Sequence, residues 1–150
     1  MKSVTLKLVL LGLFWIGVTT ATSALADGHE GHRIPDAPAE WLAKTNPYKV
    51  DEVDAKFIKK TGRLFKRKCA KCHGIKGDGQ GYKAEFFTIK PAAFANPGYM
   101  AGRQDGQLAW IITKGSPDTE MKPFGPESDV GLKEDEIWRL ITFLRKSFTN

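Results

Sequence analysis

Cysteine is scarce in this sequence of 150 residues, in which Cys69 and Cys72 are the only two. A structural zinc site needs four ligands, and two of the three histidines, His29 and His32, lie far upstream in a polar segment. Long apolar runs are also missing, because residues 8–18 fall short of the roughly 20 residues that cross a bilayer, and no second run follows. Zinc-binding and membrane-spanning classes are therefore disfavoured.

The first residues have the pattern of a secretory signal. Lys2 and Lys7 bracket a short basic region, the apolar run over 8–18 follows, and Ala24-Leu25-Ala26 has the small-x-small pattern of a cleavage site. The alternative is a signal that is retained as an anchor. We predict a signal peptide over residues 1–26, an N-terminal arm over 27–50 and one domain over 51–150, exported to the periplasm.

The two cysteines belong to the run Cys69-Ala70-Lys71-Cys72-His73, which has the CxxCH spacing of covalent haem attachment. Each thiol forms a thioether with a haem vinyl group, and His73 becomes the proximal ligand of the iron. A thioredoxin-like redox pair is disfavoured because no βαβ pattern surrounds the motif. We therefore predict one covalently attached haem c, which consumes both thiols and leaves no structural disulfide.

The second axial ligand decides whether the iron carries electrons or binds a small molecule. A methionine thioether raises the potential and gives an electron carrier, and Met100 and Met121 are the two candidates after the signal. Met121 lies in a loop between two predicted helices that can arch over the far haem face, whereas Met100 follows the motif too closely. Met121 is favoured, while Met100, an open sixth site and simple core packing of both remain alternatives.

Helical periodicity predicts three main helices. The first runs from Asp51 to Cys69 with Asp51 or Asp54 as its cap, and Gly62 in its interior suggests close approach of another helix. The others run over residues 105–114, capped by Asp105 and ended by Gly115, and over 133–147 with an apolar stripe. Between them, residues 74–81 read as a tight loop beside the haem. Aromatic and proline side chains predicted to line the haem pocket are Phe86, Phe87, Pro91, Phe94 and Tyr99.

These residues together resemble the class I monohaem cytochromes c of bacterial periplasms, over about residues 54–148. The resemblance is carried, in the family order, by Gly62 and Phe65, Cys69-x-x-Cys72-His73-Gly74, the segment Asp105 to Gly115, Met121-x-Pro123-Phe124-Gly125 and Ile137-Trp138. It implies an all-α fold with a few helices wrapped around one haem. It also implies that Met121 is the distal ligand and that Gly62 lets the first helix cross the last near Trp138.

The sequence departs from the family pattern at two places. Many members have a proline soon after the glycine loop whose carbonyl region orients the proximal imidazole, but Gly81-Tyr82 stand there. The hydrogen-bond acceptor of His73 therefore lies elsewhere. Lys133 occupies the usual place of a Ser or Thr cap, which leaves Glu136 and a hydrophobic staple to start the last helix.

Every charged residue from Lys56 to Lys76 is basic, and the formal net charge of the chain is +6. We expect this surface to steer the haem edge onto an acidic redox partner, since export argues against nucleic acid. The arm offers a weaker hypothesis: cleavage after Ala26 would leave Asp27-Gly28-His29, whose amine, amides and imidazole suit Cu(II) or Ni(II).

The expected function is a soluble periplasmic electron carrier, not an enzyme, with iron ligated by His73 and Met121. The alternatives are a haem protein whose open sixth site binds or activates a small molecule, and the haem subunit of a larger oxidoreductase. In the latter, the arm with Trp41 and Tyr48 would be the docking element.

Overall fold

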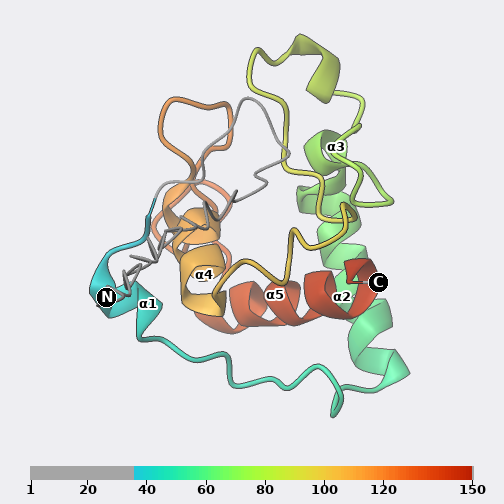
Figure 1. Cartoon of the computed structure of the whole chain (residues 1–150), viewed down its shortest axis with the longest axis vertical. Coiled ribbons are helices and arrows are strands. Elements are labelled where there is room, and N and C mark those ends of the chain that lie inside the picture. Colours follow the sequence, from blue (N-terminus) through green and yellow to red (C-terminus); the bar gives the residue numbers. More distant parts are fainter. Residues whose placement is uncertain (1–35, 150) are drawn as a thin grey trace, which may run out of the picture.

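The computed structural model describes residues 36–149, which form helices joined by loops, with no strand in that range (Figure 1). The predicted all-α fold class is confirmed. The signal predicted over residues 1–26 and the metal site predicted at His29 lie outside the described residues. The elements in chain order are α1 (Ala39–Leu42), α2 (Ala55–Lys68), α3 (Ala70–His73), the 3₁₀ helix η1 (Ala84–Phe86), α4 (Asp105–Lys114) and α5 (Glu134–Phe148).

Helix α2 begins after Asp54, whose carboxylate accepts the backbone N–H of Phe57 at 2.7 Å. Of the two predicted caps, Asp54 is therefore the one used, and the helix starts later than Asp51. Its buried face contains Leu64 and Phe65. Helix α2 ends at Lys68, directly before the cysteine motif.

Helix α5 crosses α2 (Figure 1) and has seven buried residues, more than any other helix within residues 36–149. Its first turn is stabilised by Glu136, whose carboxylate accepts the backbone N–H of Lys133 at 3.0 Å, as predicted. A Cβ added at Gly62 would lie 3.1 Å from Cε2 of Phe143, so the glycine does permit the close approach. The expectation that this crossing lies near Trp138 is wrong, because Phe143 is the residue that faces Gly62.

Helix α4 has the predicted bounds but not the predicted cap. Gln104 precedes the helix without a side-chain capping bond, and Asp105 is its first residue. The Asp105 carboxylate instead accepts Nε–H of Arg145 in α5 at 2.5 Å. The expectation that Asp105 caps the helix is therefore wrong, since its side chain joins α4 to α5. Gly115 ends the helix, with φ +80°.

The arm packs against the domain over its described part, residues 36–50, and contains the unpredicted one-turn helix α1. Asn46 Nδ2 donates to Thr142 Oγ1 at 3.0 Å. The Tyr48 hydroxyl donates to Asp135 and accepts from Arg139 Nη2 at 2.7 Å. The bond to Asp135 raises the pKa of Tyr48, and the bond from Arg139 lowers the pKa of Asp135. The arm is thus anchored along α5.

Candidate functional site

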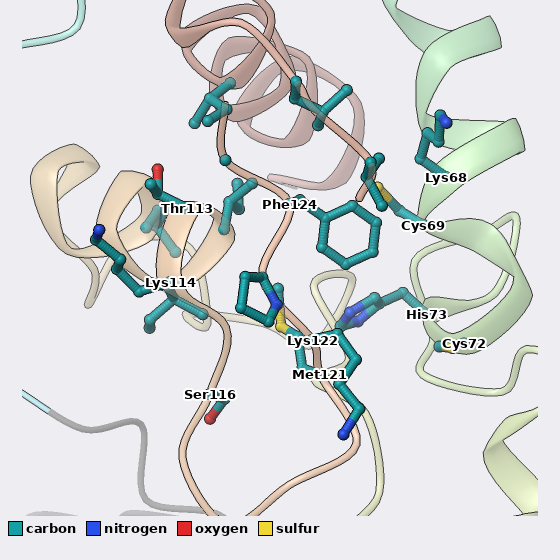
Figure 2. Close-up of a pocket in the computed structure, with 18 of the residues that line it drawn as sticks. Lys68, Cys69, Cys72, His73, Thr113, Lys114, Ser116, Met121, Lys122 and Phe124 are labelled. Carbon is teal, nitrogen blue, oxygen red and sulfur yellow. The ribbon is translucent and has the colours of Figure 1, made fainter. Parts of the chain in front are cut away.

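A cavity of about 1140 Å³ separates α2 and α3 from α4 and the loop that follows it. Cys69, Cys72, His73 and Met121 all line this cavity. Figure 2 shows the His73 ring extending from α3, and Met121 extending from the loop after α4, into the space between these elements. The structure therefore brings together the four residues singled out in the sequence.

His73 is held at two places on its ring. Its Nδ1–H donates to the backbone carbonyl of Ala92, with an N···O distance of 3.0 Å. Its face stacks on Phe94, with ring centroids 4.6 Å apart and planes inclined by 21°. Because a carbonyl only accepts, Nδ1 carries the proton and the Nε2 lone pair is available to a metal. Burial lowers the pKa of His73, which favours the neutral form, although the bond to Ala92 acts in the opposite direction.

The Ala92 carbonyl is the acceptor that the sequence left unassigned. It lies 19 residues after His73, directly beyond Pro91, which is the first proline after the motif. The carbonyl therefore comes from the residue after Pro91 and not from the region of Gly81. Pro91 was the sequence feature that could have pointed to this acceptor. The acceptor is a backbone carbonyl, however, and every residue type has one, so the sequence alone does not single out Ala92.

Cys69 directly precedes α3, Cys72 lies within this one-turn helix, and the two do not form a disulfide with each other. Burial raises the pKa of Cys69 to about 12 and also raises that of Cys72. Both are therefore protonated thiols at neutral pH in the bare chain. Figure 2 shows Cys69 beside the cavity at the end of α2, above His73.

The two candidate methionines have different surroundings. Met100 is 2% exposed and belongs to the hydrophobic core, and it is not among the residues that line the cavity. Met121 lines the cavity on the side opposite α3.

Four of the five predicted pocket residues line the cavity: Phe87, Pro91, Phe94 and Tyr99. The prediction for Phe86 is wrong, because its side chain lies in η1 and is 76% exposed. Helix α4 also forms part of the cavity wall, through Leu108, Ile111 and Ile112. These three residues were not predicted to line the haem pocket.

The chemistry of this site fits a covalently attached haem. Two thiols, an imidazole with a fixed tautomer and a thioether are the groups that c-type haem attachment and axial ligation use. They surround one large cavity whose walls include aromatic and branched aliphatic side chains. No group of three or more His, Cys, Asp or Glu side chains suited to a metal ion occurs among residues 36–149.

Comparison with known proteins gives a family match. The family model for cytochrome c matches residues 58–148. No curated protein matches the chain.

Three similar solved structures have identities of 23–24%. A chain of the Kuenenia stuttgartiensis reducing HAO-like protein complex Kustc0457/Kustc0458 is 24% identical, with a TM-score of 0.57, over 79% of this chain and 53% of that one. The KustC0563 c-type cytochrome is 23% identical, with a TM-score of 0.46, over 60% and 98%. Cytochrome cL of Methylophaga aminisulfidivorans is 24% identical, with a TM-score of 0.46, over 64% and 58%. The matched region thus spans about half of the chain from the reducing HAO-like protein complex. The similarity to that chain shows the fold.

Proposed function

Because this chain belongs to the cytochrome c family, whose members bind covalently attached haem c, we propose that it is a class I monohaem cytochrome that carries single electrons in the periplasm. Haem-based electron transfer follows from the family. The periplasmic location rests on the signal pattern of residues 1–26. No helix within residues 36–149 is long and apolar enough to cross a membrane.

Cys69 and Cys72 would hold the haem through thioethers, and His73 and Met121 would ligate its iron. When bound, the haem supplies a reversible one-electron couple. The protein contributes the orientation of the ligands and the exclusion of water. The bond to Ala92 keeps the His73 ring in one orientation and raises its basicity.

The observation that carries the proposal is the way the chain fixes Met121 on the cavity wall. The Met121 carbonyl accepts the N–H of Ser116 at 3.0 Å, and its own N–H donates to Thr119 Oγ1 at 3.1 Å. Three residues on, Phe124 N–H donates to the carbonyl of Ile112 in α4 at 3.0 Å. These bonds fix the Met121 backbone on both sides and so keep its side chain on the cavity wall. A thioether ligand there favours a closed iron and a stable ferrous state, as an electron carrier requires.

Replacing Met121 tests this assignment. Met121→Ala should lower the midpoint potential, remove the sulfur-to-ferric-iron charge-transfer band and allow carbon monoxide to bind the ferrous iron. The matched control is Met100→Leu, which changes a methionine packed in the core and should leave all three properties unchanged. A wild-type protein that binds carbon monoxide, or a Met121→Ala variant with unchanged potential, would contradict the proposal and favour an open sixth site.

The proposed partners are redox proteins with acidic docking surfaces. Lys56, Lys60 and Arg63 are exposed on α2, and the basic run continues towards the haem site. Arg67 and Lys71 lie at the cavity itself. Positive charge concentrated beside the redox centre would orient an acidic partner towards it.

The alternative role, as the haem subunit of a larger oxidoreductase, is favoured by one observation. Ile75, Tyr82 and Phe86 are 62%, 70% and 76% exposed, and an assembly would cover such side chains. Trp41 and Tyr48 pack against the core of their own chain, so they are poor candidates for the docking element. Purification of the native protein tests this role, because a carrier elutes alone whereas a subunit elutes with a second chain.

A further inference from the structure

The arm borders the haem cavity although it lies outside the part of the chain that the family model matches. The match begins at residue 58, whereas Trp41 and Lys44 both line the cavity. Trp41 is half-buried and packs against the hydrophobic core. Figure 1 shows α1, which contains Trp41, beside α4 and across the molecule from α3. The arm therefore contributes to the wall that faces the cysteine motif.

The backbone of Trp41 is seated on the first turn of α4. A Cβ added at Gly106 would overlap the carbonyl oxygen of Trp41 and would lie 3.2 Å from Cα of Leu42. Both obstructing groups are backbone atoms, so a side chain at position 106 could be accommodated only if the arm moved. Gly106 thus fixes how closely α1 approaches the cavity.

The Trp41 ring is held from the side of α5. The Lys44 ammonium lies 4.2 Å from the ring centroid and also pairs with Glu134 Oε1 at 3.4 Å. The same oxygen accepts Nε1–H of Trp138 at 3.4 Å. Lys44 therefore joins the indole to the first turn of α5, and the ring keeps its place on the cavity wall.

We infer that Trp41 is a haem-contact residue supplied by the arm, which closes the α4 side of the cavity against water and thereby raises the reduction potential of the haem. Ferric haem carries one more positive charge than ferrous haem, so contact with water stabilises the ferric form and lowers the potential. An indole on the wall excludes that water. The inference rests on haem c binding and is independent of the identity of the sixth ligand.

Substitution of Trp41 in the holoprotein tests this role. Trp41→Ala should lower the midpoint potential and increase the shift of the Soret band caused by ethylene glycol, because solvent reaches the haem. Trp41→Leu, which keeps an apolar side chain on the wall, should lie much closer to the wild type in both measurements. Tyr48→Phe is the control for arm anchoring, since it removes the hydroxyl bonds to Asp135 and Arg139 away from the cavity and should change stability alone.

Gly106→Ala provides a second route to the same effect, because it displaces the arm without altering the indole. The midpoint potential of the Gly106→Ala variant should also be lower than that of the wild type. The double variant with Trp41→Ala should show a smaller shift in potential than the sum of the two single shifts. A folded Trp41→Ala protein with unchanged potential and unchanged Soret perturbation would overturn the inference. Failure of the Met121 assignment would appear as carbon monoxide binding by the wild type, so the two outcomes are distinguishable.

Discussion

At the scale of single residues, the start of α2 shows how one side chain fixes a boundary. The first turn of a helix has backbone N–H groups without intrahelical partners, and the Asp54 carboxylate accepts one of them, from Phe57. Asp51 has the same chemistry but precedes the helix by too many residues to do this. The sequence did not decide between Asp51 and Asp54 as the cap, because both precede the first apolar position of the helix.

Removing the cap should cost stability without changing the haem site. Asp54→Ala should reduce the free energy of unfolding by about 1 kcal/mol, whereas Asp54→Asn should have a much smaller effect because asparagine also caps helices. Denaturant titration of the holoprotein measures both values. Asp51→Ala is the matched control, and a larger loss for Asp51→Ala than for Asp54→Ala would contradict the assignment of the cap.

Residue types with distinctive chemistry were the ones that could be identified from the sequence. The spacing of Cys69, Cys72 and His73 indicated haem attachment directly, and the structure places all three on one cavity. Spacing also separated Met121 from Met100, which lies in the core. The Ala92 carbonyl could not be found in this way, because every residue has a backbone carbonyl and only the folded loop selects one.

At the scale of secondary-structure elements, the loop after α4 lies close to that helix because Gly115 leaves room for it. Gly115 has φ +80°, and a Cβ there would lie 2.6 Å from the carbonyl oxygen of Met121. A side chain at position 115 would therefore push back the segment that carries the proposed ligand. The backbone at Gly98 also has a positive φ, of +77°, but a Cβ there would meet no atom within 4 Å.

Substitutions at Gly98 and Gly115 distinguish the effect of backbone strain from the effect of displacing the loop. Gly98→Ala should destabilise the protein by about 1–2 kcal/mol through its left-handed backbone alone. Gly115→Ala should destabilise it further, and it should also weaken the charge-transfer band of the proposed Met121 ligation. Thermal unfolding and the oxidised visible spectrum provide the two readouts. Equal loss of the band in both variants would mean that strain, and not the contact with Met121, is responsible.

The long helices were predictable because their apolar positions recur at helical spacing over several turns. Helix α5 was expected over residues 133–147 and is observed over Glu134–Phe148. The one-turn elements α1 and η1 were not predicted, since a single turn is too short to show periodicity. Their positions depend on tertiary contacts such as that between Trp41 and Gly106.

At the scale of the whole molecule, the placement of α2 brings basic side chains to the cavity. Arg67 and Lys68 line the cavity at the end of α2, where the motif begins. Lys49 lies on the arm, where it pairs with Glu52 at 3.0 Å. The basic run was evident in the sequence, but its position at the cavity depends on how α2 is placed in the fold.

The position of these charges should control electron exchange with charged reagents. Arg67→Glu should slow reduction of ferricyanide severalfold at low salt and accelerate the reaction with hexaammineruthenium, and both effects should diminish as salt screens the charges. Stopped-flow rates at two ionic strengths measure this. Lys49→Glu makes the same change in net charge away from the cavity, so equal effects of both variants would show that net charge alone matters.

The use of a backbone carbonyl to hold His73 makes this part of the site robust to mutation. No substitution at Ala92 deletes the acceptor, since each residue type would supply the same carbonyl oxygen. The bond depends instead on the length and path of the chain between residues 73 and 92. Insertions and deletions within that segment, more than point substitutions, are therefore the sequence changes through which the electronic properties of the imidazole would evolve.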